Sequence, residues 1–280
     1  FWKEQGASRV ILARELSLKE ITEIKQQVDL SFEAFVHGAM CISYSGRCLL
    51  SNYMIDRDSN RGNCAHSCRW QYTLMEEQRP GEYYPIEEDE RGTYIFNSKD
   101  LCMIEHLPEL IETGLDSLKI EGRMKSVHYV ATVTNIYRRA LDRYAKNPEE
   151  YTFQADWLAE LKKISHRHYT TGFYFEQPGG SEQNYESSGY ARDYDFMGIV
   201  QDYDAESGEA VIEVRNKFFA GDKVEFFGPT TDTFTQKIKL MQNEEGLMIE
   251  EAPHPKQLIT VEVKEAVNKY DLVRRKRKEE

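Results

Sequence analysis

The chain has 280 residues, of which 40% are hydrophobic and 12% aromatic, a composition typical of a globular protein with room for two domains. Its formal net charge of −12 argues against a protein that coats nucleic acid non-specifically, because phosphate binding depends on Lys and Arg. No apolar run approaches the roughly 20 residues that span a bilayer, and the first residues lack the pattern of a secretory signal. We therefore expect a cytoplasmic protein without a membrane segment.

The first predicted elements alternate between strand and helix. An apolar stretch over 10–16 predicts a strand, and a helix over 18–28 should follow, because Ser17 and Glu20 have the spacing of a capping box. A second strand is predicted over 32–38. The chain starts at Phe1, almost directly before the first strand, so we expect it to lack the front of a longer protein.

Residues 41–92 have no sustained period and predict a long functional loop. Regularity returns with strands over 93–96 and 98–102, a helix near 104–113 and a strand over 117–122. A long amphipathic helix extends from there to Tyr144. About four strand–helix units are half of a (β/α)8 barrel, so the pattern predicts a parallel sheet forming the C-terminal half of such a barrel.

The second half changes character and completes the predicted domains. Residues 1–150 form the partial barrel, and 151–188 a helical and aromatic connector. Alternating apolar residues predict a small antiparallel β-barrel over 189–273, and Arg274 begins a basic tail over 274–280. The strands expected in the β-barrel cover 210–215, 222–226, 246–250 and 259–263.

Five cysteines are the strongest chemical signal in the sequence. Their spacing, C-x6-C-x15-C-x3-C-x33-C, matches neither the paired knuckles of a zinc ribbon nor the compact run of a bacterial ferredoxin. Cys41 follows a strand, Cys48 and Cys64 share the long loop with Cys68, and Cys102 ends another strand, so their thiols can converge on one face. Thiolates suit an iron-sulfur cluster, zinc or Cu(I). Burial as unliganded thiols is the simpler alternative.

A second constellation extends from Lys119 to Lys125. Alternation places Lys119 and Glu121 on one face of a strand, and Gly122 allows a sharp turn. Arg123 and Lys125 then lie beside the positive end of a helix, which favours anion binding. A salt-bridged strand end explains the same residues equally well.

The histidines leave two alternatives open. Ligation by His37 or His66 would favour zinc, although a histidine near a cysteine is more often a hydrogen-bond partner. A peptidase needs a nucleophile and a base, and Cys41 with His37 would be such a pair. The sequence contains neither H-E-x-x-H nor G-x-S-x-G, so a peptidase gains no positive support.

Several stretches resemble peptidase family U32. The segment over 33–51, with its pattern E-x-F-x-x-G-A-x-C and the later G-R-C, carries the strongest similarity. The similarity continues over 61–70, 97–102, 119–126 and 165–174. The resemblance implies a (β/α)8 barrel preceded by a further stretch, and a C-terminal β-domain akin to the β-barrels of translation factors.

The resemblance also implies a chemistry. Several bacterial members act in prephenate-dependent 5-hydroxylation of the wobble uridine of tRNA, and others hydroxylate a ubiquinone precursor with a 4Fe-4S cluster. The cluster ligands implied for this chain are Cys41, Cys48, Cys64 and Cys102, with Cys68 as the alternative to Cys102.

The function expected from this resemblance is tRNA uridine hydroxylation, with tRNA as partner and prephenate as co-substrate. The alternatives are a collagenase-like peptidase and a cluster-binding subunit that works with a second family member. The candidate residues for binding an anionic substrate are Arg47, Arg69, Lys119, Glu121, Arg123 and Lys125.

Overall fold

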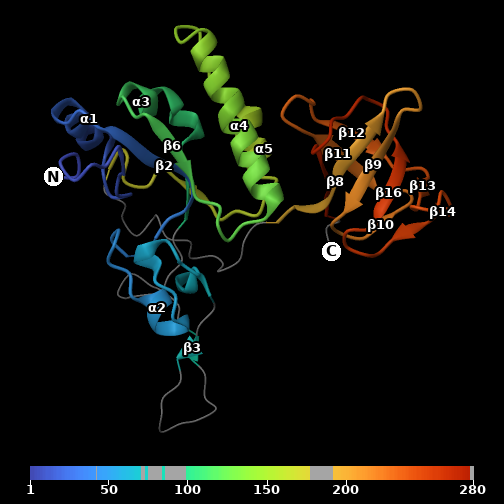
Figure 1. Cartoon of the computed structure of the whole chain (residues 1–280), viewed down its shortest axis with the longest axis horizontal. Coiled ribbons are helices and arrows are strands. Elements are labelled where there is room, and N and C mark those ends of the chain that lie inside the picture. The colour runs from blue at the N-terminus through green and yellow to red at the C-terminus, as the bar shows by residue number, and fades with distance from the viewer. Residues whose placement is uncertain (42, 71–72, 75–83, 86–98, 177–191, 278–280) are drawn as a thin grey trace. The chain divides into compact units, whose positions relative to one another are not determined.

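The computed structural model describes residues 1–41, 43–70, 73–74, 84–85, 99–176 and 192–277. The chain divides into two compact units, which Figure 1 shows as a mixed helix–strand part and an all-β part. The first unit comprises Phe1–Lys162 and His166–Ala191, and the second comprises Lys163–Ser165 and Arg192–Glu280. None of the described helices combines the length and apolarity that a bilayer-spanning segment needs.

The first unit is built on a five-stranded mixed sheet. Strand β2 (Ser31–Ala39) pairs in parallel with β1 (Arg9–Ile11) and with β6 (Ser117–Ile120). Strand β5 (Asp100–Cys102) is antiparallel to β2, and β7 (Tyr169–Thr170) is parallel to β5. The expectation of an all-parallel sheet is therefore wrong at β5, because this strand enters the sheet from the end at which β2 leaves it.

Two other predictions change at the edges of this sheet. The strand expected over 10–16 ends at Ile11, so the residues that follow Ile11 lie outside this strand and can line a cavity beside the sheet. The segment over 151–188 is not only a connector, because β7 belongs to the first sheet. The strand expected over 93–96 lies outside the described residues.

Helices pack against the sheet where apolar periodicity predicts them. Helix α1 (Leu18–Gln27) begins with the expected capping box, in which Ser17 Oγ accepts from the Glu20 backbone N–H and Glu20 Oε2 accepts from the Ser17 backbone N–H. The predicted helix near 104–113 is a 3₁₀ turn followed by α3 (Leu107–Glu112). The other two helices that the sequence predicted are α4 (Val127–Lys146) and α5 (Ala155–Leu161).

Tyr137 connects α4 to the sheet. Its buried hydroxyl donates to the Val36 carbonyl at 2.7 Å and accepts from the Met103 backbone N–H at 3.1 Å. The Met103 N–H also donates directly to the Val36 carbonyl at 3.0 Å, so the hydroxyl adds to a backbone pair that is already hydrogen-bonded in the core. The contact fixes α4 against β2 and against the chain leaving β5.

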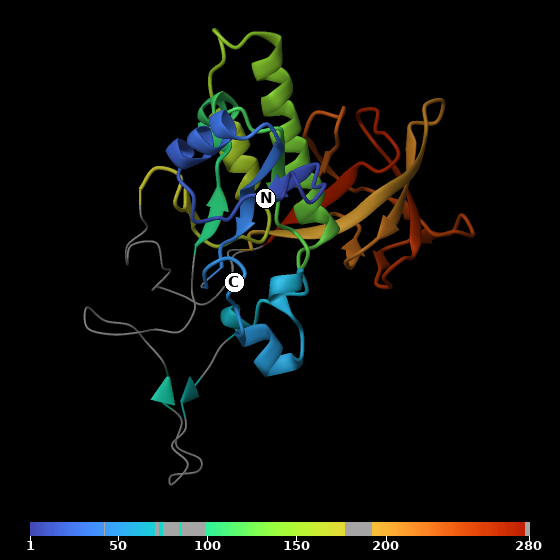
Figure 2. The ribbon, with the colours of Figure 1, turned by 60° about the vertical axis from the view of Figure 1, so that its left-hand side comes forward.

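The predicted long loop contains short helices and a hairpin. Helix α2 (Leu50–Ile55) is followed by 3₁₀ turns at Ser59–Arg61 and Ser67–Arg69, and β3 (Thr73–Leu74) pairs with β4 (Tyr84–Pro85). Figures 1 and 2 agree in placing α2 beyond the carboxyl end of β2. The loop thus covers the end of the sheet at which Cys41 leaves β2.

The second unit is a curled, eight-stranded antiparallel half-barrel. Its strand order is β12-β11-β17-β8-β9-β16-β13-β14, and side chains alternate inward and outward, as in β9 with Ala210, Ile212 and Val214 buried. A separate two-stranded pair joins β10 (Phe218–Phe219) to β15 (Glu251–Ala252). The eight strands are Tyr194–Asp204 (β8), Glu209–Val214 (β9), Lys223–Phe227 (β11), Phe234–Lys237 (β12), Met241–Gln242 (β13), Met248–Ile249 (β14), Leu258–Glu262 (β16) and Leu272–Lys276 (β17).

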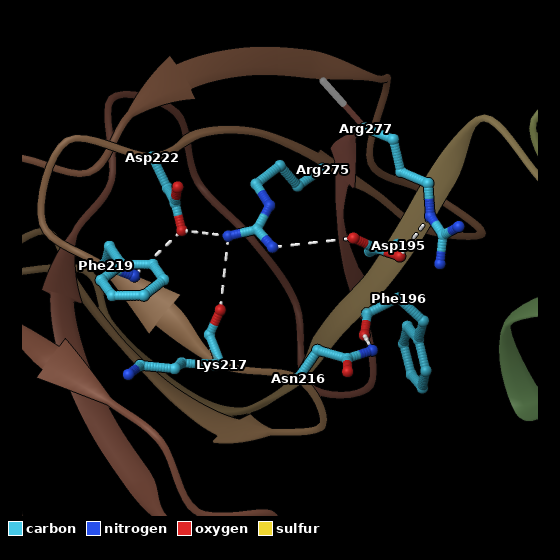
Figure 3. Close-up of polar contacts among 8 residues, drawn as sticks. All are labelled: Asp195, Phe196, Asn216, Lys217, Phe219, Asp222, Arg275 and Arg277. Carbon is cyan, nitrogen blue, oxygen red and sulfur yellow. Dashed lines mark hydrogen bonds and ion pairs between the residues drawn. The ribbon is translucent and has the colours of Figure 1, made fainter. Parts of the chain in front are cut away.

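The basic run that begins at Arg274 is not a solvated tail. Its first three residues complete β17, and the fully buried Arg274 forms an ion pair with Glu225 at 2.7 Å. Figure 3 shows the next arginine, Arg275, between Asp222 at 2.6 Å and Asp195 at 3.6 Å. The arginines lie here because carboxylates on neighbouring strands and turns offset their charge.

Candidate cysteine-lined site

A cavity of about 390 Å³ lies in the first unit at the carboxyl end of β2. Four of the five cysteines line it, namely Cys41, Cys48, Cys64 and Cys68. The prediction that several thiols meet where a strand ends therefore agrees with the structure.

Gly38 brings the two sides of this cavity together. Its φ of +112° is one that side-chain-bearing residues rarely adopt, and a Cβ there would lie 2.8 Å from the Glu121 Cβ and overlap the Glu121 carbonyl oxygen. The Glu121 backbone N–H donates to the His37 carbonyl at 2.8 Å. The missing side chain thus lets the turn after β6 lie directly on β2, so that Cys41 and Glu121 reach the same cavity.

Asn60 holds the loop that carries Cys48. Its side-chain oxygen accepts from the Cys48 backbone N–H at 3.0 Å, and its amide donates to the Cys48 carbonyl at 2.9 Å. Further along, the Ala65 backbone N–H donates to the Ser51 hydroxyl at 3.1 Å. These contacts fix the loop on both sides of Cys64 without regular secondary structure.

The surroundings shift the cysteine pKa values in opposite directions. Burial raises the pKa of the Cys41 thiol, and the neighbouring Cys48 adds to this effect. Burial acts in the same direction on Cys48, but hydrogen bonds from the Ser59 hydroxyl and the Ser51 backbone outweigh it and lower the Cys48 pKa. Cys48 is therefore the thiol of this pair that ionises more readily, and a thiolate is the form that binds metal.

Cys102 does not line the described cavity, unlike the other four cysteines. It is buried at the end of β5, and burial raises its pKa to about 12. The structure therefore gathers three of the four expected ligands, together with the alternative Cys68.

Among the described residues no three His, Cys, Asp or Glu side chains are grouped closely enough for a single metal ion. The donor set nevertheless suits an iron-sulfur cluster, which takes thiolates on separate irons.

The candidate anion-binding residues divide into two groups. Lys119, Arg123 and the acidic Glu121 line the cavity. Lys125 does not, because its nearly buried ammonium lies 3.8 Å from the buried Asp100 carboxylate. Arg47 is exposed outside the cavity lining, and the side chain of Arg69 lies outside the described part of the chain.

Arg14 is a cavity residue that the sequence reasoning missed. Its guanidinium carbon lies 3.6 Å from the Phe35 ring centroid, and burial lowers its pKa although Cys41 and Glu121 act in the opposite direction. The sequence offered no signal for it, because the predicted strand over 10–16 placed Arg14 inside the strand, whereas β1 ends at Ile11.

The two histidines near the cysteines have different surroundings. His37 is fully buried against Tyr129, Tyr137 and Tyr169, and burial lowers its pKa to about 3, so it stays neutral. Neither of its ring nitrogens has a hydrogen-bond partner among the described residues, so the structure shows no hydrogen bond from His37 to Cys41 of the kind a catalytic pair uses. His66 does line the cavity, and its Nε2 lies 4.0 Å from a Glu121 carboxylate oxygen.

Comparison with known proteins identifies the family. Residues 1–184 match the sequence model of peptidase family U32, and residues 192–274 match that of the U32 C-terminal domain. The chain therefore belongs to peptidase family U32, and the predicted resemblance is confirmed.

The curated relatives have two kinds of name. The tRNA hydroxylation protein P1 of Bacillus subtilis (strain 168) is 44% identical over 98% of this chain and 65% of its own length. The tRNA hydroxylation protein P of Escherichia coli (strain K12) is 40% identical over 90% of this chain and 64% of its own length. A Porphyromonas gingivalis protein named collagenase is 30% identical over 95% of this chain and 65% of its own length. The chain thus spans less than two-thirds of the length of these relatives.

A solved structure is similar to the C-terminal region. It is the crystal structure of the C-terminal domain of a Geobacillus thermoleovorans protein described as a U32 peptidase. The sequences are 41% identical, the match covers 30% of this chain and 92% of that chain, and the TM-score is 0.29.

Proposed function

We propose that this chain belongs to a tRNA-modifying enzyme that 5-hydroxylates the wobble uridine, with prephenate as co-substrate and an iron-sulfur cluster in the thiol-lined cavity. The observation that carries the proposal is that one cavity is lined by four thiols and a nearby cation, namely Cys41, Cys48, Cys64, Cys68 and Lys119. The similarity to proteins named for tRNA hydroxylation supports the choice of substrate. A tRNA substrate implies a cytoplasmic enzyme.

The proposed cofactor is a 4Fe-4S cluster on Cys41, Cys48, Cys64 and a fourth thiolate. Cavity lining favours Cys68 as the fourth ligand, whereas the family resemblance favours Cys102. A bound cluster supplies one-electron chemistry that amino-acid side chains lack. The cationic groups on the cavity wall would offset the negative charge of the thiolates.

The residues of the chain itself would attract and orient the anionic substrates. Lys119 and Arg123 place positive charge on the cavity wall, which raises the local concentration of anions. Glu121 accepts from the Arg123 backbone N–H at 3.0 Å and so fixes the turn that carries Arg123, directly after the strand that carries Lys119. We also propose that the parallel strands β1, β2 and β6 belong to a (β/α)8 barrel from which the antiparallel β5 departs, because Cys41 lies beyond the carboxyl end of β2, where such barrels place their active sites.

Complementation tests the proposed function. A bacterial strain lacking the gene is supplied with the intact protein or with its Cys48→Ser or Asn52→Ser variant, and 5-hydroxyuridine-derived nucleosides in tRNA are measured by mass spectrometry. Cys48→Ser should abolish the modified nucleosides, whereas Asn52→Ser should retain them, because Asn52 is exposed in the same loop and lies off the cavity. An unchanged nucleoside level with Cys48→Ser would contradict the proposed role of the cavity.

Iron content tests the cofactor and identifies the fourth ligand. Anaerobically purified protein should be brown with about four irons per chain. The iron should fall in Cys41→Ser and in only one of the variants Cys68→Ser and Cys102→Ser. Protein that is colourless and contains zinc, or iron that is unaffected by either of the last two substitutions, contradicts the proposed four-thiolate cluster.

The alternatives give different results in the same preparations. The collagenase name of one relative motivates an assay with denatured collagen, in which cleavage by iron-free protein would favour a peptidase. Bacillus subtilis has two relatives, named tRNA hydroxylation proteins P1 and P2, which motivates the proposal of a second family member as a subunit. Activity that appears only when two family members are purified together would favour a complex.

A further inference from the structure

We propose that Arg14, with Lys119 and Arg123, binds a carboxylate group of a small anionic substrate in the thiol-lined cavity. The proposal deepens the proposed function, because it gives the co-substrate a binding site and a chemical class, and prephenate, a dicarboxylate, belongs to that class.

The contacts of Arg14 leave its N–H groups available. Among the described residues its side chain has no hydrogen bond or ion pair, and its contact is with the Phe35 ring, 3.6 Å from the ring centroid. A guanidinium that lies over a ring uses its face, so this contact consumes none of its five N–H donors. The buried arginine of the second unit, Arg274, is instead paired with a carboxylate at 2.7 Å. Arg14 is therefore a half-buried cation whose donors have no partner in the described chain.

The cavity wall carries an excess of positive charge. Lys119 lies 5.1 Å from the same Phe35 ring and 3.5 Å from a Glu33 carboxylate oxygen, which partly offsets its charge. Arg123 donates to the neutral Asn63 side-chain oxygen at 3.0 Å, so this contact leaves its charge uncompensated. Three cations thus face the cavity, and Glu121 is the carboxylate among the described residues that line it. The thiolates of a bound cluster would offset part of this positive charge, and the N–H donors of Arg14, which have no partner in the described chain, stay available to an anionic ligand.

The size of the cavity favours a small molecule. Its volume of about 390 Å³ lies at the lower end of the range of small-molecule sites, about 300–1,000 Å³, and the proposed cluster would occupy part of it, so the remaining space suits only a small ligand. The planar fork of a guanidinium matches the two oxygens of a carboxylate and binds them with parallel hydrogen bonds. Phosphate shares the charge and presents a similar pair of oxygens, so the experiment must separate the two anions.

Anion binding to the intact, iron-loaded protein tests the assignment without tRNA. Isothermal titration calorimetry at low salt would measure the affinity for malonate and, separately, for inorganic phosphate. The variants are Arg14→Gln, Arg14→Lys and the control Lys19→Gln, which removes a positive charge from a side chain that is 86% exposed on α1. Iron content and thermal unfolding of each variant report whether the cluster and the fold are retained.

We expect Arg14→Gln to weaken malonate binding about 10- to 100-fold, the range set by losing a charge-assisted hydrogen bond. The malonate affinity of Arg14→Lys should lie between those of the wild type and Arg14→Gln, because lysine keeps the charge and lacks the planar fork of N–H donors. Lys19→Gln should bind malonate with the affinity of the wild type. Iron content should not change in any of them. If Arg14→Gln binds malonate within twofold of the wild type, the proposal is overturned.

Two further outcomes also decide against the assignment. Tighter binding of phosphate than of malonate would reject the carboxylate as the ligand. Loss of iron in Arg14→Gln would show that the arginine serves the cluster and not the substrate. Malonate binding through Arg14 in a protein that hydroxylates no tRNA would uphold this site and reject the proposed function, so the two failures are distinguishable.

Discussion

Replacing Gly38 by alanine should destabilise the first unit more than any other glycine replacement near the cavity. The new Cβ would lie 2.8 Å from the Glu121 Cβ and overlap its carbonyl oxygen, at a φ of +112°. Backbone strain of about 1–2 kcal/mol and overpacking of about 1–3 kcal/mol predict a total loss of roughly 2–5 kcal/mol. Because the atoms involved are backbone and Cβ, no rotamer change relieves the overlap.

Gly46 provides a matched control in the same region. Its φ is +75°, and a Cβ added there would meet nothing within 4 Å. Gly46→Ala should therefore cost only the backbone strain, about 1–2 kcal/mol. The difference between the two variants isolates the contact between β2 and the turn at Glu121.

Tryptophan fluorescence during urea unfolding measures this loss for the first unit alone. The three tryptophans of the chain, Trp2, Trp70 and Trp157, all belong to that unit. The free energy of unfolding should be lowest for Gly38→Ala, and the iron content of that variant should fall with it. A difference of about 0.5 kcal/mol is typical of a substitution without effect. If the free energies of unfolding of Gly38→Ala and Gly46→Ala differ by less than this, the proposed overlap with Glu121 is refuted.

Two further predictions concern buried polar groups. Tyr137→Phe should lower the free energy of unfolding by about 0.5–1.5 kcal/mol, because the hydrogen bonds of the hydroxyl are lost while the Met103 N–H still donates to the Val36 carbonyl at 3.0 Å, and an unchanged free energy by tryptophan fluorescence would contradict this. In the second unit, burial alone would raise the pKa of Glu225, but Arg274 and Lys163 together outweigh it and hold this pKa below its ordinary value. The stability that this lowered pKa contributes is present above the unfolded pKa of about 4.3 and is lost as the pH falls through the folded pKa. Unfolding followed by circular dichroism should therefore show a steeper fall of stability with decreasing pH for the wild type than for Glu225→Gln. Equal slopes of stability against pH would count against the ion pair.

Local patterns predicted much of the secondary structure. The capping box at Ser17 and the apolar periodicity up to Tyr144 predicted α1 and α4, because hydrogen bonds and side-chain spacing within one helix decide both features. Alternation likewise predicted β9 and β16 of the second unit. The longest strand, β8, was missed, since its sequence has acidic residues at both ends and less regular alternation.

The cavity was predictable only in part. Strand ends indicated that Cys41 would lie at the rim of the sheet, and the family pattern added the loop cysteines. Neither could place Cys102, because its distance from the cavity depends on the antiparallel pairing of β5 with β2. The sequence likewise could not show that Lys125 lies outside the cavity lining, because its ammonium forms an ion pair with Asp100, which lies 25 residues earlier in the chain.

The sequence by itself determined the family and which thiols and cations are available to a site, because these depend on residue identity and short-range order. Tertiary structure decided which of those residues face one another. It brought Arg14 to the thiols, turned Lys125 away and placed Arg274 inside a strand, since each outcome depends on partners far away in the sequence. Charged side chains are directed by the carboxylates and rings they meet, and only the folded chain specifies those neighbours.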